Sequence, residues 1–295
     1  MIETHLTAQT ADGVGLSVHI NGDGDPLLLI PGLGASRSAF TPILADLARA
    51  HRVITFDPRG IGESEGAGNT TLTAMALDVV AVLDAVEVAA AAVFGASMGG
   101  LVAQHVVVDH PARVADLMLA ATSPGGDAGV DPKPEDQAAL MGKGAHTPED
   151  AYRIACTVLY SPQFQRAHPE FIEAQIRERA LHPVRPRVFS GQYKAMWEPD
   201  DSFERLASVA VPALVMHGTD DVVIPFENAR ILARRIPGAQ LRPFEGSGHL
   251  FFHERPAETA RVVTEHLRHA GTGAAQTSSA AESSSPSGES SATGS

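Results

Sequence analysis

The sequence predicts an α/β fold, in which a mostly parallel, twisted sheet has helices on both faces. Short β-branched apolar runs alternate with longer helix-like segments, which is the pattern of such sheets. The chain has 295 residues, enough to bury a large core. Residues 123–208 break the alternation with several prolines and helical patches but no clear strand. We therefore expect a core from residues 1–122 and 209–270, with 123–208 inserted as a helical cap.

The individual elements follow from hydrophobic periodicity. The runs expected to form strands are 14–20, 27–30, 53–56, 92–94, 116–121, 213–216 and 240–243. The helices expected between them are 39–49, 72–86, 98–109, 226–235 and 256–269, with further helical patches in the cap at 148–159 and 169–181. Residues 271–295 are rich in Ser, Gly, Ala and Thr and lack any aromatic residue, Leu, Ile or Val. Such a segment cannot offset the entropy of ordering, so we expect a disordered tail.

Charge and composition exclude several partners. The formal net charge is -13 and the 22 basic residues are scattered, which argues against nucleic acid or a polybasic membrane anchor as a partner. The N-terminus does not resemble a signal peptide, and no apolar stretch is long enough to span a membrane. These features predict a cytoplasmic protein. The single cysteine, Cys156, excludes an internal disulfide and is expected to be a small buried hydrophobe.

A serine between two glycines follows the run ending at Phe94. Gly95, Ser97 and Gly99 form the G-x-S-x-G spacing of a nucleophile elbow at a strand-to-helix turn. Side chains at the two glycine positions would collide across such a turn. The amide of Met98 would then point at the space above the hydroxyl. The segment lacks both the G-x-G-x-x-G spacing and a Walker lysine, which disfavours dinucleotide or phosphate binding, while a purely structural turn stays open.

A nucleophilic serine needs a base, and the base needs an orienting carboxylate. Downstream, one predicted strand ends at His217 before a loop with Asp220 and Asp221, and another precedes a loop with His249. The order Ser, Asp, His, each at the carboxyl end of a strand, is the order found in α/β hydrolases.

The chain resembles the α/β-hydrolase superfamily over about residues 12–269. The motifs that carry the resemblance are IPGLG (30–34), FDPRGIGES (56–64), GASMGG (95–100), HGTDDVVIP (217–225) and GSGHLFFHERP (246–256). It is similar to cap-bearing members such as 3-oxoadipate enol-lactonases, carboxylesterases and meta-cleavage-product hydrolases. The resemblance implies that Ser97 is the nucleophile, His249 the general base and then acid, and Asp221 the orienting carboxylate.

Asp221 is preferred over Asp220 because the family pattern is G-x-x-D-x-x-x-P, which Gly218, Asp221 and Pro225 satisfy. His217 and His253 are expected to be packing or hydrogen-bonding residues, and His110 to end a helix. We expect no metal, because no H-E-x-x-H or close ligand pair occurs along the chain.

The second oxyanion donor is expected to be the amide of Leu33, beside that of Met98. The family often has His-Gly where this chain has Pro31-Gly32, a departure that puts the orientation of the loop in doubt. FDPRGIGES is interpreted as a structural turn whose glycines permit positive φ.

Serine at position 97, rather than aspartate, favours hydrolysis of an ester or lactone without a cofactor. The cap is expected to roof a pocket for a small to medium, largely apolar substrate. The candidate lining residues, at positions that in a helical insertion are more often core packing, are Met141, Tyr160, Phe164, Tyr193, Met196 and Trp197. Cofactor-free haloperoxidase, perhydrolase and carbon–carbon hydrolase chemistry remain as alternatives. A ligand-binding protein without activity is disfavoured because all three triad residue types are present.

Overall fold

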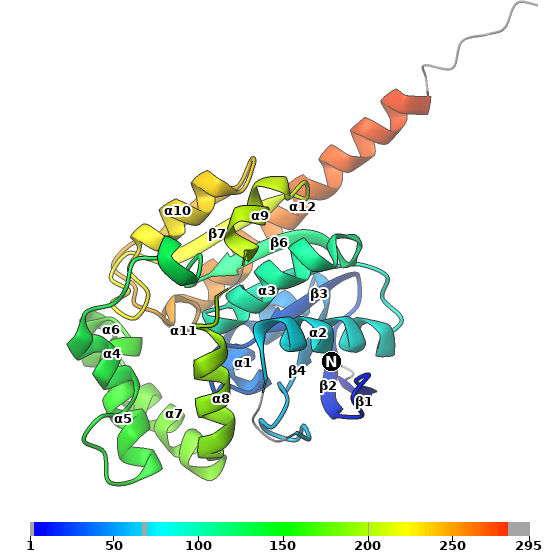
Figure 1. Cartoon of the computed structure of the whole chain (residues 1–295). Helices are drawn as coiled ribbons and strands as arrows, with labels where there is room; N and C mark the ends of the chain where they lie inside the picture. Colours follow the sequence, from blue (N-terminus) through cyan, green and yellow to red (C-terminus); the bar gives the residue numbers. More distant parts are fainter. Residues whose placement is uncertain (1–2, 67–69, 200, 283–295) are drawn as a thin grey trace, which may run out of the picture.

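The computed structural model describes residues 3–66, 70–199 and 201–282, whose strands form a single eight-stranded sheet (Figure 1). Its order is β1-β2-β4-β3-β5-β6-β7-β8. The strands are β1 (Glu3–Gln9), β2 (Gly15–Asn21), β3 (Asp25–Ile30), β4 (His51–Phe56), β5 (Ala91–Ala96), β6 (Val114–Ala120), β7 (Ala213–Gly218) and β8 (Gln240–Phe244).

From β4 to β8 every neighbouring pair is parallel, whereas β1 and β2 pair antiparallel at one edge. This arrangement confirms the predicted α/β fold with a mostly parallel sheet. Strand β1 is absent from the sequence-based prediction. Its side chains are mostly exposed and polar, as expected of an edge strand, so it has no apolar run to reveal it.

Helices cover both faces of the sheet and bury a separate core on each. One core joins the sheet to α2, α3 and α10, and the other joins it to α1, α11 and α12. The core helices are α1 (Thr41–Leu47), α2 (Leu72–Ala85), α3 (Met98–Asp109), α10 (Glu227–Arg235), α11 (Phe251–Glu254) and α12 (Pro256–Glu282). Single turns of 3-10 helix occur at η1 (Arg37–Phe40), η2 (Pro111–Arg113), η3 (Gly126–Ala128) and η4 (Leu206–Ser208).

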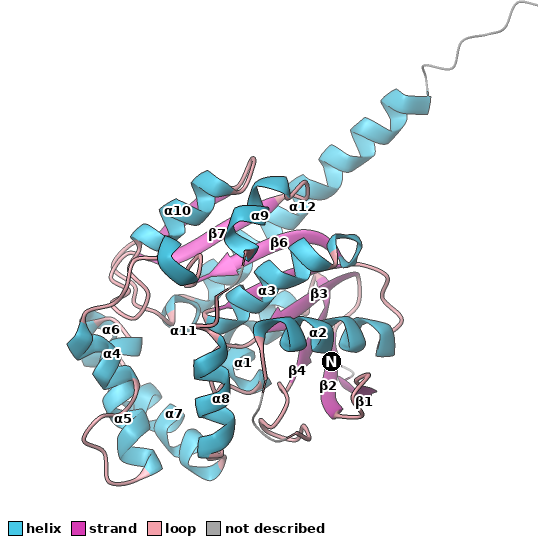
Figure 2. Ribbon diagram, viewed as in Figure 1, coloured by secondary structure: helices cyan, strands magenta, loops and turns pink. Residues whose placement is uncertain are grey.

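Six helices lie between β6 and β7, of which α4 to α8 gather at one end of the sheet whereas α9 packs beside α3 (Figure 2). They are α4 (Pro134–Leu140), α5 (Pro148–Leu159), α6 (Pro162–Ala167), α7 (Pro169–Leu181), α8 (Pro186–Ala195) and α9 (Ser202–Arg205). The first five begin with proline. Amides in the first turn of a helix have no helical acceptor, so a proline there loses no helical hydrogen bond. In α5 a capping box between Thr147 and Asp150 adds a second start signal. These helices occupy the segment that the sequence assigns to the cap.

The last helix differs from the prediction of a disordered tail from residue 271. Helix α12 continues to Glu282 and extends away from the body of the molecule (Figure 1). Residues 271–282 contain four alanines and no proline. They extend a helix whose first half is anchored in the core, so no new helix nucleus is required. Residues 283–295 of the predicted tail lie outside the described residues.

No helix in the described part of the chain is long and apolar enough to cross a membrane.

Candidate active site

Ser97 lies at the sharp turn between β5 and α3. Its backbone has φ 55° and ψ -122°, in the positive-φ region that residues other than glycine rarely adopt. Holding a residue there costs on the order of 1–3 kcal/mol, which the surrounding structure must offset. The turn is fixed by hydrogen bonds from the Ser97 amide to Ala120 O (2.9 Å) and from Thr122 Oγ1 to Ser97 O (2.7 Å).

The two glycines that flank Ser97 are required sterically. A Cβ added at Gly95 would lie 2.3 Å from the carbonyl oxygen of Gly99. A Cβ at Gly99 would lie 2.2 Å from the carbonyl oxygen of Ile30. Both distances are far inside van der Waals contact, and both neighbours are backbone atoms that cannot rotate away. The clash at Gly95 is the collision across the turn that the sequence predicts, whereas the clash at Gly99 is with the end of β3.

His249 and Asp221 meet across two loops at the carboxyl ends of β8 and β7. His249 Nδ1 lies 2.8 Å from Asp221 Oδ2, and both residues are buried. The other carboxylate oxygen, Oδ1, accepts hydrogen bonds from the amides of Val223 (2.9 Å) and Ile224 (2.8 Å). With its Nδ1 proton directed at the carboxylate, the imidazole keeps a lone pair on Nε2, as a general base requires.

Asp221 is held as a carboxylate despite its burial. Burial by itself raises the pKa of Asp221, but the charge of His249 and hydrogen bonds from His217 and His249 outweigh it. The net result is a pKa below the ordinary aspartate value. The Asp221 carboxylate is therefore negatively charged, and this charge would stabilise an imidazolium at His249.

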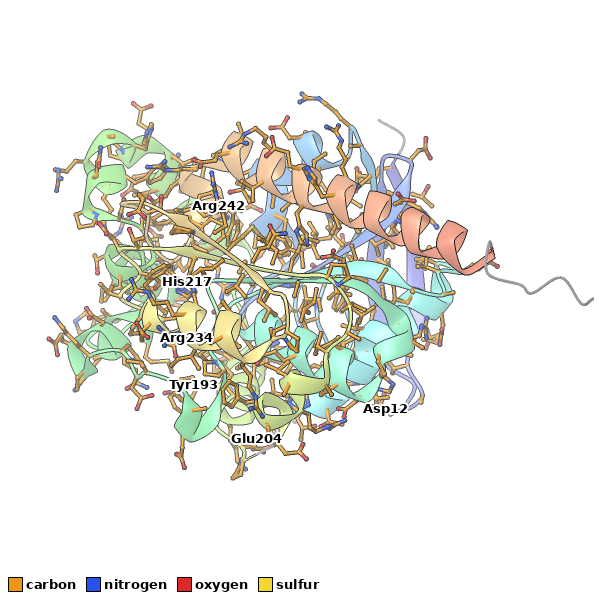
Figure 3. All side chains as sticks on the ribbon, turned by 90° about the horizontal axis from the view of Figure 1, so that it is seen from above. Asp12, Tyr193, Glu204, His217, Arg234 and Arg242 are labelled. Carbon is orange, nitrogen blue, oxygen red and sulfur yellow. The ribbon has the colours of Figure 1, made fainter. Side chains whose placement is uncertain are left out.

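The surroundings of Asp220 and His217 differ from those of Asp221 and His249. Asp220 is exposed, and its only recorded side-chain contact among the described residues is with Thr219 Oγ1 at 3.4 Å. His217 is fully buried inside the fold (Figure 3). Its Nε2 lies 2.8 Å from Ile224 O and 3.0 Å from Asp221 Oδ2, so it supports the loop and the carboxylate. Its hydrogen bonds agree with the role predicted for it.

The loop that carries His249 is tied to the cap by Glu254. The Glu254 carboxylate accepts from the amides of Ser161 (2.7 Å) and Gly248 (3.2 Å). The amide of Leu250 donates to the carbonyl of Leu159 (3.0 Å). Residues on both sides of His249 are therefore fixed to the end of α5, which limits the positions that the imidazole can take.

Ser97 and His249 line one cavity of about 610 Å³ between the sheet and the cap helices. No hydrogen bond between Ser97 Oγ and His249 Nε2 is recorded among the described residues. Such contacts are often long or poorly aligned in ligand-free enzymes and tighten in the substrate complex. Ser97 and His249 therefore border the same space.

The loop after β3 lies directly against Ser97. A Cβ added at Gly32 would lie 3.1 Å from the Cβ of Ser97 and 3.6 Å from its hydroxyl oxygen. Leu33 lines the cavity, and its amide donates to no backbone carbonyl in the described part of the chain. Met98 is the first residue of α3, where helix geometry leaves the amide without a helical acceptor. Gly32, next to Leu33 in the chain, thus approaches Ser97, and the role of the Leu33 and Met98 amides as oxyanion donors stays a prediction.

Two cap residues make hydrogen bonds to the backbone of the loop after β3. The Gly34 amide donates to Gln192 Oε1 (2.8 Å), and the Arg179 guanidinium donates to Gly34 O. Arg179 also lies over the ring of Tyr152 and borders the cavity. Neither residue was singled out from the sequence, because their partner is a backbone group more than a hundred residues away.

Replacing Gln192 with leucine should lower kcat by about tenfold, because the Gly34 amide loses its acceptor and the loop that carries Leu33 shifts. KM should change little, since Gln192 is buried outside the cavity lining. The matched variant Gln192→Glu keeps an acceptor oxygen and should recover most of kcat. Steady-state kinetics of the three proteins test this; equal losses of kcat in both variants would show that the hydrogen bond does not position the loop.

The predicted pocket residues divide into two groups. Tyr193, Met196 and Trp197 line the cavity as expected. The structure contradicts the assignment of the other three. Met141 points outward and is 38% exposed, Tyr160 is buried in packing below the cap, and Phe164 stacks on Tyr160 with ring centroids 5.5 Å apart. The prediction erred because residue type alone does not specify which face of a cap helix meets the core.

The sequence of α5 contains a periodic signal for part of the cavity lining. Tyr152, Ala155 and Leu159 all border the cavity and are spaced by three and four residues, so they share one face of the helix.

His253 connects the cap to the core next to the cavity. Its Nε2 donates to Ala39 O (2.7 Å), and its Nδ1 accepts from the Tyr160 hydroxyl (3.0 Å). These bonds agree with the hydrogen-bonding role predicted for it. Burial lowers the pKa of His253 from 6.5 to about 4, although the bond to Ala39 acts in the opposite direction.

His253 should make the protein less stable in acid. Between pH 6.5 and 4 the unfolded chain binds a proton at this residue that the folded chain does not, so stability falls as the pH falls. The loss from this group reaches about 3 kcal/mol near pH 4. The variant His253→Gln keeps a donor for Ala39 but cannot titrate. Chemical denaturation at several pH values should therefore give a shallower pH dependence for this variant than for wild type, and parallel curves would refute the assignment.

The FDPRGIGES segment forms a turn with glycines at positive φ, as predicted, but it also lines the cavity through Asp57, Ile61, Gly62 and Glu63. Gly60 and Gly62 have positive φ, and a Cβ at Gly62 would lie 2.2 Å from Asp57 Oδ2. The Asp57 carboxylate accepts from the amides of Arg37 (2.9 Å) and Glu63 (3.0 Å), which joins the turn to the loop before α1.

Comparisons with known proteins agree with this geometry. A family model described as alpha/beta hydrolase fold matches residues 25–256. BpoC of Mycobacterium tuberculosis, provisionally named a non-heme bromoperoxidase, is 31% identical over 248 residues, 82% of this chain and 94% of the relative. 3-Oxoadipate enol-lactonase 1 of Acinetobacter baylyi is 27% identical over 271 residues, 91% of this chain and 99% of the relative.

Among solved structures, a thermophilic esterase from Thermogutta terrifontis with bound malate superposes with a TM-score of 0.78 and 28% identity. The match covers 90% of this chain and 99% of the esterase. Together these likenesses confirm the resemblance that the sequence motifs indicate.

Proposed function

The chain belongs to the alpha/beta hydrolase fold family, and from that premise we propose that it hydrolyses a carboxylic ester or lactone through an acyl-enzyme on Ser97. The observation that carries the proposal is the buried 2.8 Å contact between His249 Nδ1 and Asp221 Oδ2 beside the cavity that Ser97 lines. This contact orients His249, the proposed base, in the cavity that Ser97 also lines.

In the first half of the reaction, His249 Nε2 takes the proton of the Ser97 hydroxyl as Oγ attacks the substrate carbonyl. The amides of Leu33 and Met98 donate to the oxyanion that develops. The ester C–O bond then breaks, and the His249 imidazolium gives its proton to the leaving alkoxide. Asp221 stabilises the imidazolium and keeps its Nδ1 proton in place.

In the second half, water takes the place of the alcohol. His249 removes a proton from this water, the hydroxide attacks the acyl carbonyl, and the proton passes to Ser97 Oγ as the acid leaves. No cofactor takes part in either half.

The cavity suits a substrate of small to medium size. Its volume of about 610 Å³ lies within the usual range for small-molecule sites. The roof is formed by Tyr193, Met196 and Trp197, and α5 contributes Tyr152 and Leu159. This lining supports a largely apolar acyl or alcohol group.

A second candidate is cofactor-free peroxide chemistry. The name of BpoC, a relative over most of the chain, favours it. The same serine and histidine could form a peracid from a carboxylic acid and hydrogen peroxide.

A substrate panel with the purified chain tests the proposal. It should contain p-nitrophenyl esters of increasing acyl length, lactones of several ring sizes and a vinylogous diketone, with a separate assay for halogenation in peroxide and bromide. We expect hydrolysis of short to medium esters or lactones and no cleavage of the diketone. Halogenation without ester hydrolysis would establish the second candidate, and no turnover in any assay would indicate a binding protein.

A further inference from the structure

Three potential metal ligands meet at the sheet edge formed by β1 and β2. His5 and His19 are direct partners across the antiparallel pair, and their rings stack with centroids 4.4 Å apart. Glu63 reaches them from the turn after β4, with Oε2 3.4 Å from His19 Nε2. One ligand atom from each residue lies within 4.8 Å of the other two. This spacing places two imidazoles and a carboxylate around one point.

The hydroxyl of Ser17 lies among the three ligand atoms. Its Oγ is 3.1 Å from His5 Nε2, 3.2 Å from His19 Nε2 and 3.0 Å from Glu63 Oε2. A hydroxyl has one hydrogen to donate, whereas the carboxylate and an imidazole lone pair would both accept it. If His5 and His19 are neutral and each directs its Nε2 lone pair at Ser17, the one hydroxyl hydrogen cannot serve all three acceptors, and a bound cation would take its place.

Glu3 contacts His19 in the way that a carboxylate outside the metal coordination shell contacts a metal-bound histidine. Its Oε1 lies 2.8 Å from His19 Nδ1, and His19 is only 7% exposed. A proton on Nδ1 directed at this carboxylate leaves the lone pair on Nε2, the atom that faces His5 and Glu63. Metal-ligating histidines almost always make such a contact through their second nitrogen.

The charge of the cluster favours a cation. Glu3 and Glu63 contribute two negative charges, and the Arg37 guanidinium, 3.9 Å from Glu63 Oε2, contributes one positive charge. These three side chains leave the cluster with a net negative charge.

We propose that His5, His19 and Glu63 bind a divalent cation of the zinc type, with Ser17 Oγ or a water as the fourth donor. Two imidazole nitrogens and one carboxylate oxygen suit zinc better than magnesium or calcium. Tetrahedral ligands about 2.1 Å from zinc lie about 3.4 Å from one another. The His19 to Glu63 separation already has this value, and the exposed His5 on an edge strand can move to complete the set.

The bound cation would join the edge strand to the rim of the active-site cavity. Glu63 lines that cavity, and its amide is bonded to Asp57 Oδ2. The sequence predicts no metal because the ligands lie far apart along the chain. The register of β1 and β2 places His5 beside His19, and the turn after β4 brings Glu63 to both.

Metal titration of the full chain tests this site independently of catalysis. The protein, free of any affinity tag, is treated with EDTA, desalted and titrated with Zn²⁺ by calorimetry and with Co²⁺ by visible absorption. We expect one Zn²⁺ per chain, tetrahedral Co²⁺ bands and a higher melting temperature with Zn²⁺. His5→Ala and Glu63→Gln should each weaken binding by about a hundredfold or more, and Glu3→Gln by about ten- to a hundredfold.

The control is His146→Ala, which removes an exposed histidine of the cap and should bind as wild type does. Because His5 is exposed, its replacement should not prevent folding, and circular dichroism checks this. Unchanged Zn²⁺ affinity in both His5→Ala and Glu63→Gln would place the metal elsewhere and overturn the proposal. The absence of stoichiometric binding to wild type would also overturn it and would leave the cluster as a hydrogen-bond network.

Discussion

Replacement of Asp221 with asparagine should lower kcat for ester hydrolysis by about ten-thousand-fold. The amide NH₂ would face His249 Nδ1 and favour the tautomer with its proton on Nε2, which cannot accept the proton of Ser97. The asparagine Oδ1 can still accept from the amides of Val223 and Ile224, so the loop should keep its shape. Initial-rate kinetics, with melting temperatures to check folding, measure the effect.

The neighbouring Asp220 provides the matched control for this prediction. It is exposed and has no recorded contact with His249 among the described residues, so Asp220→Asn should retain nearly full activity. Equal losses in the two variants would mean that the 2.8 Å contact of Asp221 does not orient the base. A selective loss in Asp220→Asn would reassign the carboxylate to that residue.

Replacement of Ser97 with alanine should have the largest effect, a loss of turnover on the order of a million-fold. The change removes the nucleophile without adding bulk to the turn. Alanine tolerates φ 55° no worse than serine, so the folded fraction should not fall. Rates measured at high enzyme concentration, with substrate binding followed separately, distinguish lost chemistry from lost affinity.

Ser123→Ala is the control for the serine variant, because Ser123 also lines the cavity but lies outside the elbow. It should keep most of the wild-type rate. If Ser97→Ala retained comparable turnover, the acyl-enzyme mechanism would be wrong, and the elbow would have only the structural role that its sequence also permits.

The sequence could predict elements that have local signals. Helix α3 begins directly after Ser97 and ends before His110 and Pro111, and the predicted limits match its observed ends. Helices α5 and α7 begin at prolines and are likewise placed correctly. Strand β1 has no signal because an exposed edge strand has no apolar run, and α12 exceeds its predicted end because a helix that has already formed can propagate without a new nucleus.

The candidate site was predictable where motif spacing decides position. Ser97, Asp221 and His249 each follow a strand, and parallel strands bring their carboxyl ends to one edge. Contacts that depend on side-chain direction were not predictable. Tyr160 and Tyr193 both lie at the C-terminal parts of cap helices, yet one packs on His253 and the other lines the cavity.

The most direct test of the account is to map the covalent adduct formed when the wild-type chain reacts with a fluorophosphonate. Peptide mass spectrometry should find one phosphonate per chain on the peptide that contains Ser97, because this serine lies at the strained turn in the cavity that also holds His249, oriented by Asp221. An adduct on another serine, or no adduct in folded protein, would contradict the assignment of Ser97 as the activated nucleophile.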